Sequence, residues 1–456
     1  MPAQITLTIV KGKLLGRQYT FDSRATCIMG RSPEANIQLP DDAEHKTISR
    51  YHCLLDIMPP NIRIRDFGSK NGTYVNGQKI GQREAHQTPE EGAKINFPEY
   101  DLQSDDEIEL GNTVFAVHIE ADPAEINIPN FSPVTINHNQ PPTQPPNFLE
   151  IIKRWLGLAA NGNNQLLAIQ GYNIIKLLGR GGFGEVYLAQ HNSSGKFIAL
   201  KVMLPAISGN ENAVQRFLRE TENTKALHHP HVVQVIDYGF FEGIFFFTME
   251  YCAGGTVADL MQQYGGKLPV DIALPITLQV LNGLEYSHNA EIPYVKLSDG
   301  GFGKGRGLVH RDLKPVNILL NYIDGKITAK IGDYGLAKAF DLAGLSGQTL
   351  TGSQAGTPAF IPRQQLLNFK YTKPEVDVWA TSASLYNMLT GEFPRNFTGD
   401  PFLAVLQNDP VPILQRNASI PKNLAEVIDL GLVEKPEIYF KSAVDFKNSL
   451  LDSIRT

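Results

Sequence analysis

The sequence lacks three features that mark common special classes of protein. Its 41 Lys and Arg residues are outnumbered by 47 Asp and Glu, so it has no basic field of the kind that attracts nucleic acid. Its three cysteines are widely spaced, without CxxC pairs or His clusters at zinc spacing, which favours a reducing compartment. It has no apolar run of the roughly 18 residues that span a bilayer, and no secretory signal at its start. We therefore expect a cytoplasmic protein with no transmembrane segment and no nucleic-acid partner.

The length of 456 residues predicts about two or three domains, and the composition changes along the chain. Residues 1–121 contain short alternating strands separated by turn residues, which predicts an all-β sandwich. Residues 122–165 are interpreted as a linker, because their first part is rich in Pro, Asn, Gln and Thr and cannot bury enough apolar surface to fold. Residues 166–456 begin with strand-like patterns and become helical after residue 270, which predicts a small sheet-rich lobe followed by a larger helical lobe.

Apolar residues recur at helical spacing at the end of the linker. Phe148, Ile152 and Trp155 lie on one face of this pattern, opposite Lys153 and Arg154, which predicts a short amphipathic helix near residues 148–158. Three placements are open for it: on a membrane, on a partner, or on the domain that follows. Packing on the following domain is favoured, because one short apolar face is usually buried internally.

A glycine-rich stretch, LGRGGFGEVYL at residues 178–188, lies between two apolar strands. Glycines at 179, 181 and 184 leave room for backbone amides to approach a polyphosphate. A dinucleotide-binding fold would need a helix after the last glycine, whereas this chain continues as a strand. The stretch therefore favours a hairpin over phosphates and argues against a Rossmann fold.

The segment VHRDLKPVN, residues 309–317, places an Asp, a Lys and an Asn in one loop, and Asp333-Tyr334-Gly335 follows it. Such a loop can orient a hydroxyl, contact a phosphate and bind Mg²⁺. Together with the glycine-rich hairpin and the strand IALK ending at Lys201, it resembles the catalytic loop of eukaryotic-type (bacterial) protein kinases. Lys314 makes it similar to the serine/threonine branch of that family.

The resemblance implies a role for each polar residue of the loop. Asp312 orients the substrate hydroxyl and accepts its proton, and Lys314 contacts the γ-phosphate. Lys201 contacts the α- and β-phosphates and pairs with Glu220 of a following helix. These four residues are the implied catalytic set.

The resemblance also implies ATP and Mg²⁺ (or Mn²⁺) as cofactors, with Asn317 and Asp333 as the metal ligands. His310 and Tyr334 are interpreted as packing groups without a chemical role. The implied nucleotide-binding residues are Leu178, Gly179, Gly181, Gly184, Val186, Ala199, Lys201, Met249, Glu250, Cys252 and Leu319.

Residues 336–355 correspond to the activation loop of the family. In that family, an Arg directly before the catalytic Asp, here Arg311, occurs in kinases that are controlled by phosphorylation of this loop. The phosphate supplies a negative charge that neutralises the neighbouring cations. Thr349 and Thr351 are the candidate phosphosites, and Thr357 resembles the threonine that selects a Ser/Thr substrate.

The chain departs from the family pattern in two places. Where the family has Ala-Pro-Glu, this chain has Pro362-Arg363-Gln364, and Tyr439 lies where the ion-pair partner of that Glu would be. Both halves of a buried ion pair are therefore replaced together, which is less damaging than leaving one charge alone. Residues 289–306, rich in Gly and charge, are an apparent insertion that we expect to be an exposed loop.

Three motifs in the first 121 residues follow the order expected of a forkhead-associated (FHA) domain, which they resemble: residues 30–32, 49–52 and 70–77. FHA domains bind phosphothreonine peptides, and Arg, Ser and Lys groups at one end of a sandwich suit a phosphate. The resemblance implies phosphate contacts from Arg31, Ser49, Arg50 and Lys70, and a peptide contact from Asn71. His52 is interpreted as a buried hydrogen-bonding residue instead.

These observations predict a multidomain chain with an all-β FHA sandwich and an α+β bilobal protein kinase fold. The first hypothesis for its function is a serine/threonine kinase that phosphorylates protein substrates, with the FHA module binding phosphothreonine peptides or proteins. The second is a weakly active or inactive pseudokinase scaffold, motivated by the lost Glu at Gln364. In a third hypothesis, the FHA module binds the phosphorylated activation loop of the same chain or of another copy. Binding to another copy would make the protein self-associate.

Overall fold

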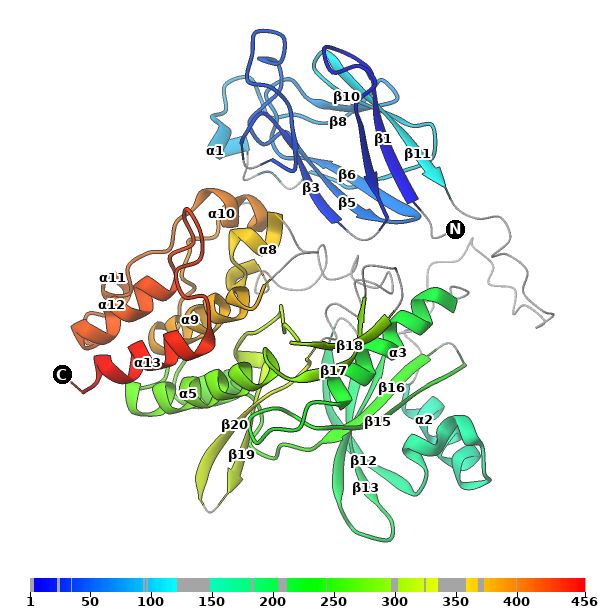
Figure 1. Ribbon diagram of the computed structural model, residues 1–456, viewed down its shortest axis with the longest axis vertical. Helices are drawn as coiled ribbons and strands as arrows, with labels where there is room; N and C mark the ends of the chain where they lie inside the picture. The colour runs from blue at the N-terminus through cyan, green and yellow to red at the C-terminus, as the bar shows by residue number, and fades with distance from the viewer. Residues whose placement is uncertain are drawn as a thin grey trace.

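The structure is a computed structural model of the chain. It describes residues 4–120 and 148–455, apart from residues 23–24, 34, 93–94, 96, 182–183, 204–210, 243, 297–301, 324, 335–357, 368–372 and 399. Figure 1 shows a β-sandwich, coloured blue to cyan, above a body of two lobes that runs from green to red. Residues 122–147 of the predicted linker 122–165, and the activation loop 336–355, lie outside the described residues.

The amino-terminal body is a sandwich of two sheets. The first sheet consists, in spatial order, of β2 (Gln18–Phe21), β1 (Gln4–Lys11), β11 (Thr113–Glu120), β10 (Glu107–Leu110), β7 (Thr73–Val75) and β8 (Gln78–Gly81). The second consists of β4 (Ile37–Gln38), β3 (Ala25–Gly30), β5 (Cys53–Met58), β6 (Asn61–Asp66) and β9 (Tyr100–Leu102). Alternate residues of β1 point into the shared core, where Ile5, Leu7 and Ile9 are fully buried. The predicted all-β sandwich is confirmed; a short helix, α1 (Pro89–Gly92), lies in a connection.

The small lobe is a sheet covered on both faces. Its strands, in spatial order, are β12 (Tyr172–Gly181), β13 (Gly184–His191), β14 (Phe197–Met203), β16 (Ile244–Glu250) and β15 (Val235–Phe241). One face carries α3 (Glu211–Lys225), and the other carries α2 (Phe148–Ala160) with the short turn η2 (Asn164–Ile169). Trp155 of α2 is 1% exposed, with its ring centroid 5.5 Å from that of Phe246. The helix predicted near residues 148–158 thus packs on the lobe that follows it.

The large lobe is mainly helical. Its helices are α4 (Val257–Gln263), α5 (Val270–Ser287), α8 (Arg363–Leu367), α9 (Glu375–Thr390), α10 (Pro401–Gln407), α11 (Ile413–Arg416), α12 (Lys422–Gly431) and α13 (Ala443–Ser453). It also contains the hairpins β17 (Glu291–Lys296) to β18 (Phe302–Arg306) and β19 (Ile318–Ile323) to β20 (Lys326–Ile331), with short turns η3 (Pro315–Asn317) and η4 (Pro358–Phe360). Helix α9 is buried on all sides and forms the centre of the lobe. The predicted α+β bilobal fold is confirmed.

The prediction that residues 289–306 form an exposed loop is wrong. Strands β17 and β18 form a hairpin there that contacts α3, the helix of the small lobe that carries Glu220. Asn223 of α3, 2% exposed, donates from Nδ2 to the carbonyl of Tyr294 and accepts from its amide, both at 2.9 Å. Glycines and charged residues occur in exposed hairpins as well as in loops, so composition alone could not distinguish a hairpin from a loop here.

Within the part of the chain that the structure describes, none of the helices is both long and apolar enough to cross a bilayer.

Candidate active site

Three polar side chains converge in the loop before β19. The Lys314 ammonium lies 2.9 Å from the Asp312 carboxylate. Asn317 Nδ2 donates to the Asp312 carbonyl at 2.7 Å and approaches its Oδ2 at 3.1 Å. Asp312 keeps 22% of its side chain exposed, so it remains accessible to a substrate while two neighbours orient it. The structure therefore brings together Asp312, Lys314 and Asn317 as predicted from their spacing.

A buried carboxylate of α9 supports the backbone of this loop. Asp377 accepts from the amides of His310 at 2.7 Å and Arg311 at 2.8 Å, and His288 Nε2 lies 2.8 Å from its Oδ2. Burial alone would raise the pKa of Asp377, but the hydrogen bond and charge of His288, with further contributions, lower it overall. Arg311 has φ = 70°, a strained conformation that these bonds stabilise. Asp377 therefore holds the backbone of the two residues directly before Asp312.

The two predicted packing groups, His310 in the loop and Tyr334 after β20, are both buried. His310 is fully buried, and its Nε2 donates to the Gly332 carbonyl at 2.7 Å. Its ring meets that of Tyr334 edge to face at a centroid distance of 4.8 Å. The Tyr334 hydroxyl bonds with Ser287, and its carbonyl accepts from Thr224 of α3 at 3.1 Å.

Lys201 and Asp333 form an ion pair across the two lobes, with Nζ 2.8 Å from Oδ1. Burial alone would raise the pKa of Asp333, but the charge and hydrogen bond of Lys201 lower it overall, with contributions from His310 and Lys314. The implied pairing of Lys201 with Glu220 is not formed: among the described residues, the carboxylate that Lys201 contacts is that of Asp333.

Five of the eleven implied nucleotide-binding residues share one apolar cluster between the lobes. Ala199, Met249 and Cys252 are at most 8% exposed there, with Val186 and Leu319 packed against them. Burial raises the pKa of the Cys252 thiol to about 12, so it is an inert packing group. Leu178 is 38% exposed and lies outside this cluster. Glu250 pairs with Lys330 at 2.9 Å, which fixes the end of β16 next to the cluster.

The glycines of the predicted phosphate-binding hairpin differ in their structural role. A Cβ at Gly184 would lie 2.0 Å from the Val202 carbonyl, so this position is required by the strand packing itself. A Cβ at Gly179 would meet nothing within 4 Å, so the space beside it is open. Gly181 ends β12, and residues 182–183 are outside the described residues. Gly179 therefore fits the phosphate-binding interpretation better than Gly184 does.

A buried ion network anchors α8, where the family pattern is broken. Glu434 accepts from the Arg363 side chain at 2.6 Å, from the Arg363 amide at 2.8 Å, and from Arg395. All three residues are at most 3% exposed. Gln364 replaces the Glu of the family, and its side chain donates to the Glu434 carbonyl at 2.5 Å. Sequence reasoning missed this network, although an Arg next to the expected Glu position was a visible signal.

The predicted phosphopeptide residues meet at one end of the sandwich. The Lys70 amide donates to Ser49 Oγ at 3.0 Å, the Arg31 amide to the Ser49 carbonyl at 3.1 Å, and Asn71 Nδ2 to the Thr47 carbonyl at 2.6 Å. The Arg31 guanidinium pairs with the exposed Asp41. Arg50 is exposed beside them, so the four cationic and hydroxyl groups border one surface.

Two residues of these motifs serve the framework of the sandwich. His52 is fully buried, with Nδ1 accepting from the Ser49 amide at 2.9 Å and Nε2 3.1 Å from the Gly72 carbonyl. Burial lowers the pKa of His52, which keeps it neutral. A Cβ at Gly30 would lie 2.1 Å from the Arg50 carbonyl. His52 and Gly30 therefore hold the loops that carry Arg31 and Ser49.

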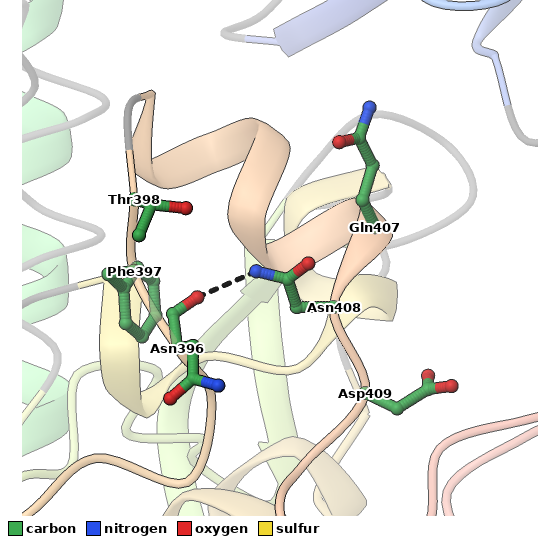
Figure 2. Close-up of a pocket in the computed structure, with 6 residues that line it drawn as sticks. All are labelled: Asn396, Phe397, Thr398, Gln407, Asn408 and Asp409. Carbon is green, nitrogen blue, oxygen red and sulfur yellow. Dashed lines mark hydrogen bonds between the residues drawn. The ribbon is translucent and has the colours of Figure 1, made fainter. Parts of the chain in front are cut away.

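A cavity of about 660 Å³ lies elsewhere, beside α10. Figure 2 shows its lining, in which Asn408 Nδ2 donates to the Asn396 carbonyl at 2.6 Å. The other lining residues are Phe397, Thr398, Gln407 and Asp409. No predicted site residue lines it, and it is wide open to solvent, so we do not assign it to the reaction.

Comparison with known families agrees with this geometry. The protein kinase domain family matches residues 172–421, which is more than half of the chain, and the FHA domain family matches residues 27–98. The chain belongs to the protein kinase family and carries an FHA domain.

Individual relatives match the kinase part. A probable serine/threonine-protein kinase of Clostridium perfringens is 29% identical over 61% of this chain and 38% of its own length. The serine/threonine-protein kinase PknD of Mycobacterium tuberculosis is 32% identical over 62% of this chain and 40% of its own length. The chain thus spans about two fifths of the length of these relatives. The crystal structure of the Mycobacterium tuberculosis PknI kinase domain is 25% identical, covers 62% of this chain and 96% of that domain, and has a TM-score of 0.45.

Proposed function

We propose that this chain is an active serine/threonine protein kinase that transfers the γ-phosphate of ATP to Ser or Thr hydroxyls of proteins. The observation that carries the proposal is the convergence of Asp312, Lys314 and Asn317 in one loop, supported from below by the buried Asp377. This arrangement suits phosphoryl transfer, in which positioning and charge stabilisation supply most of the catalysis.

In the proposed reaction, Asp312 orients the substrate hydroxyl and accepts its proton. Lys314, which already contacts Asp312, places its positive charge where the γ-phosphate would lie. Lys201 supplies a second cation for the α- and β-phosphates. Lys201 contacts Asp333 in the structure, its ammonium has further N–H donors for phosphate, and Glu220 is its proposed partner when nucleotide is bound.

The donor set fits a Mg²⁺ or Mn²⁺ ion. Asn317 and Asp333 offer amide and carboxylate oxygens, and Mg²⁺ is usually held by one or two carboxylates together with substrate phosphates. A metal ion bound there neutralises charge on the transferred phosphoryl group. The Asp333 carboxylate is suited to this role because its pKa is lowered, which keeps it ionised at neutral pH.

The rival hypothesis of an inactive scaffold rested on the missing Glu at Gln364. The Arg363, Glu434 and Arg395 network supplies another buried anchor at the same helix, with the charge signs exchanged between the partners. This observation supports the active-enzyme proposal, because the platform after the activation loop is still tied to the large lobe.

We also propose that the FHA domain binds phosphothreonine, through Arg31, Ser49, Arg50 and Lys70 for the phosphate and Asn71 for the peptide backbone. The contacts of Ser49 with Lys70 and Arg31 support a shared anion site. Its ligand is a phosphorylated substrate or the activation loop of this protein, with Thr349 and Thr351 as the proposed phosphosites; both lie outside the described residues.

The test is phosphate transfer from labelled ATP to casein or myelin basic protein, with the Asp312→Asn variant. Removing the general base is expected to lower kcat by about 10²- to 10⁴-fold. Asp452→Asn, an exposed Asp to Asn change on α13, is the matched control and should keep full activity. Absence of transfer by the unmodified protein after activation with Mg²⁺ and ATP would favour the scaffold, and mass spectrometry of that sample would locate the phosphosites.

A further inference from the structure

The second sheet of the FHA sandwich has an apolar outer face. Ile28 of β3 and Leu54 of β5 oppose each other across the ladder, and Leu54 opposes Arg65 of β6. Because successive side chains of a strand point to opposite faces, these three point away from the sandwich core that holds Cys27 and Leu55. Yet Ile28 is 1% exposed, Leu54 4% and Arg65 7%. The outer FHA face, defined as Ile28, Leu54, Arg65 and Phe67, is therefore covered.

The kinase domain of the same chain covers it. Leu366 of α8 and Phe402, Leu403 and Leu406 of α10 join the outer FHA face in one buried cluster, each at most 5% exposed. Figure 1 shows the sandwich lying directly against α8 and α10. A face this apolar would be an unusual surface on a domain that moved freely on a linker.

An ion pair crosses the same interface. Arg65 Nη1 lies 2.7 Å from Asp400 Oδ2, with 8% and 4% of the two side chains exposed. The Arg65 guanidinium also lies 5.4 Å from the ring centroid of Phe402. The other oxygen of Asp400 accepts from the first amides of α10, at 2.9 Å from Phe402 and 3.1 Å from Leu403. Arg65 thus matches one specific carboxylate, which a nonspecific apolar contact would not require.

Helix α8 contacts the FHA domain at its last residue, Leu367, and the loop of Asp312 through its central residue, Gln365. Asn36 of the FHA domain donates to the Leu367 carbonyl at the end of α8. Gln365, in the same helix, donates to the Arg311 carbonyl at 2.5 Å, directly before Asp312. Asn36 also ends the loop that begins at the proposed phosphate ligand Arg31.

We propose that the FHA domain docks in cis on α8 and α10 of its own kinase domain, and that this docking holds the catalytic loop in place through α8. The docking itself stands on the buried contacts alone. Its effect on catalysis rests on the proposed kinase function.

Small-angle X-ray scattering of the full chain tests the docking. Leu54→Glu places a charge on the outer FHA face but outside the sandwich core, and Arg65→Ala removes one ion-pair partner; both should increase the radius of gyration. Arg63→Ala is the matched control, because Arg63 points from the same face of β6 but pairs with Asp101 within the FHA domain. An unchanged radius of gyration for a folded Leu54→Glu variant, judged by its circular dichroism, would overturn the docking. A compact particle of twice the expected mass would overturn docking in cis in favour of exchange between two copies.

The catalytic consequence has a separate measurement. Undocking is expected to lower kcat toward a protein substrate on the order of 5-fold or more, the lower range of coupling between sites, in Leu54→Glu and Arg65→Ala but not in Arg63→Ala. A larger radius with unchanged kcat would overturn the coupling and leave the docking intact. If the unmodified protein has no transferase activity, the proposed function fails, whereas the scattering result still decides the docking.

Discussion

The strongest test of the platform anchor is Glu434→Ala, which removes one carboxylate from between two buried guanidinium groups. Glu434 is 3% exposed, Arg363 3% and Arg395 1%, so water cannot replace the lost partner without a rearrangement. Burial lowers the pKa of Arg395, and the charge of Glu434 counteracts that effect. The substitution therefore leaves two buried guanidinium groups with Asp409, 3.1 Å from Arg363, as the carboxylate that still faces them.

The size of the effect follows from these contacts. Removing one partner of a buried ion pair costs about 3–5 kcal/mol, a large share of the about 5–15 kcal/mol that stabilise a typical domain. For a lobe of this size, that loss corresponds to a fall in Tm of about 6–20 °C. Glu426→Ala is the matched control: its side chain is 65% exposed and 3.9 Å from Lys422, so we expect a loss below about 1 kcal/mol.

The assay can be confined to the large lobe. The chain has two tryptophans, Trp155 in the small lobe and Trp379 in the large one, where the Arg395 guanidinium lies 4.5 Å from the Trp379 ring centroid. Urea denaturation followed by Trp379 fluorescence, in a Trp155→Phe background, measures the free energy of unfolding of that lobe even when the whole chain unfolds in several steps. A loss below about 1 kcal/mol for Glu434→Ala, equal to the Glu426 control, would refute the reasoning that this network anchors α8.

Three further predictions concern separate parts of the chain. Asn223→Ala removes both bonds to the Tyr294 backbone, and leaving those groups unsatisfied should cost about 1–3 kcal/mol, seen as faster hydrogen exchange of β17 and α3 but not of β19. Arg31→Ala should weaken binding of a phosphothreonine peptide by about tenfold or more in calorimetry, since a charged hydrogen bond contributes about 1.5–3 kcal/mol; equal affinity would remove Arg31 from the site. Because the pKa of Asp377 is lowered in the folded state, its contribution is present above the ordinary value of 3.8 and is lost as pH falls through the lower folded value. The unfolding free energy of Asp377→Asn should therefore vary less with pH below 4 than that of the unmodified protein, and parallel curves would contradict this.

Local patterns in the sequence predicted the parts of the site that are close together in the chain. Asp312, Lys314 and Asn317 lie within six positions, so the short loop that contains them restricts how far apart they can be. The alternation of Ile5, Leu7 and Ile9 likewise predicted an inward face of β1, because the side-chain direction of a strand alternates with period two. Such inferences need only local geometry.

Other features depended on pairs that are distant in the chain. The carboxylate that Lys201 contacts in the structure is that of Asp333, 132 positions away, whereas the family resemblance implied Glu220 as its partner. The hairpin at residues 291–306 was not predicted, because its composition is also typical of loops. The two hydrogen bonds of Asn223 to the Tyr294 backbone, which attach the hairpin to α3, could not be predicted from the sequence.

The sequence by itself therefore determined the class of the protein and its two kinds of domain, and it supplied the residues proposed for catalysis, because each depends on short motifs with defined spacing. The tertiary structure decided how these parts are held together. The ion network of Glu434 and the contact of Arg65 with Asp400 join residues that are far apart in the chain. Nothing in a single sequence indicates that these residues pair with each other. Their effect arises from burial, because a charge is strongly coupled to its partner only after folding has excluded water from both.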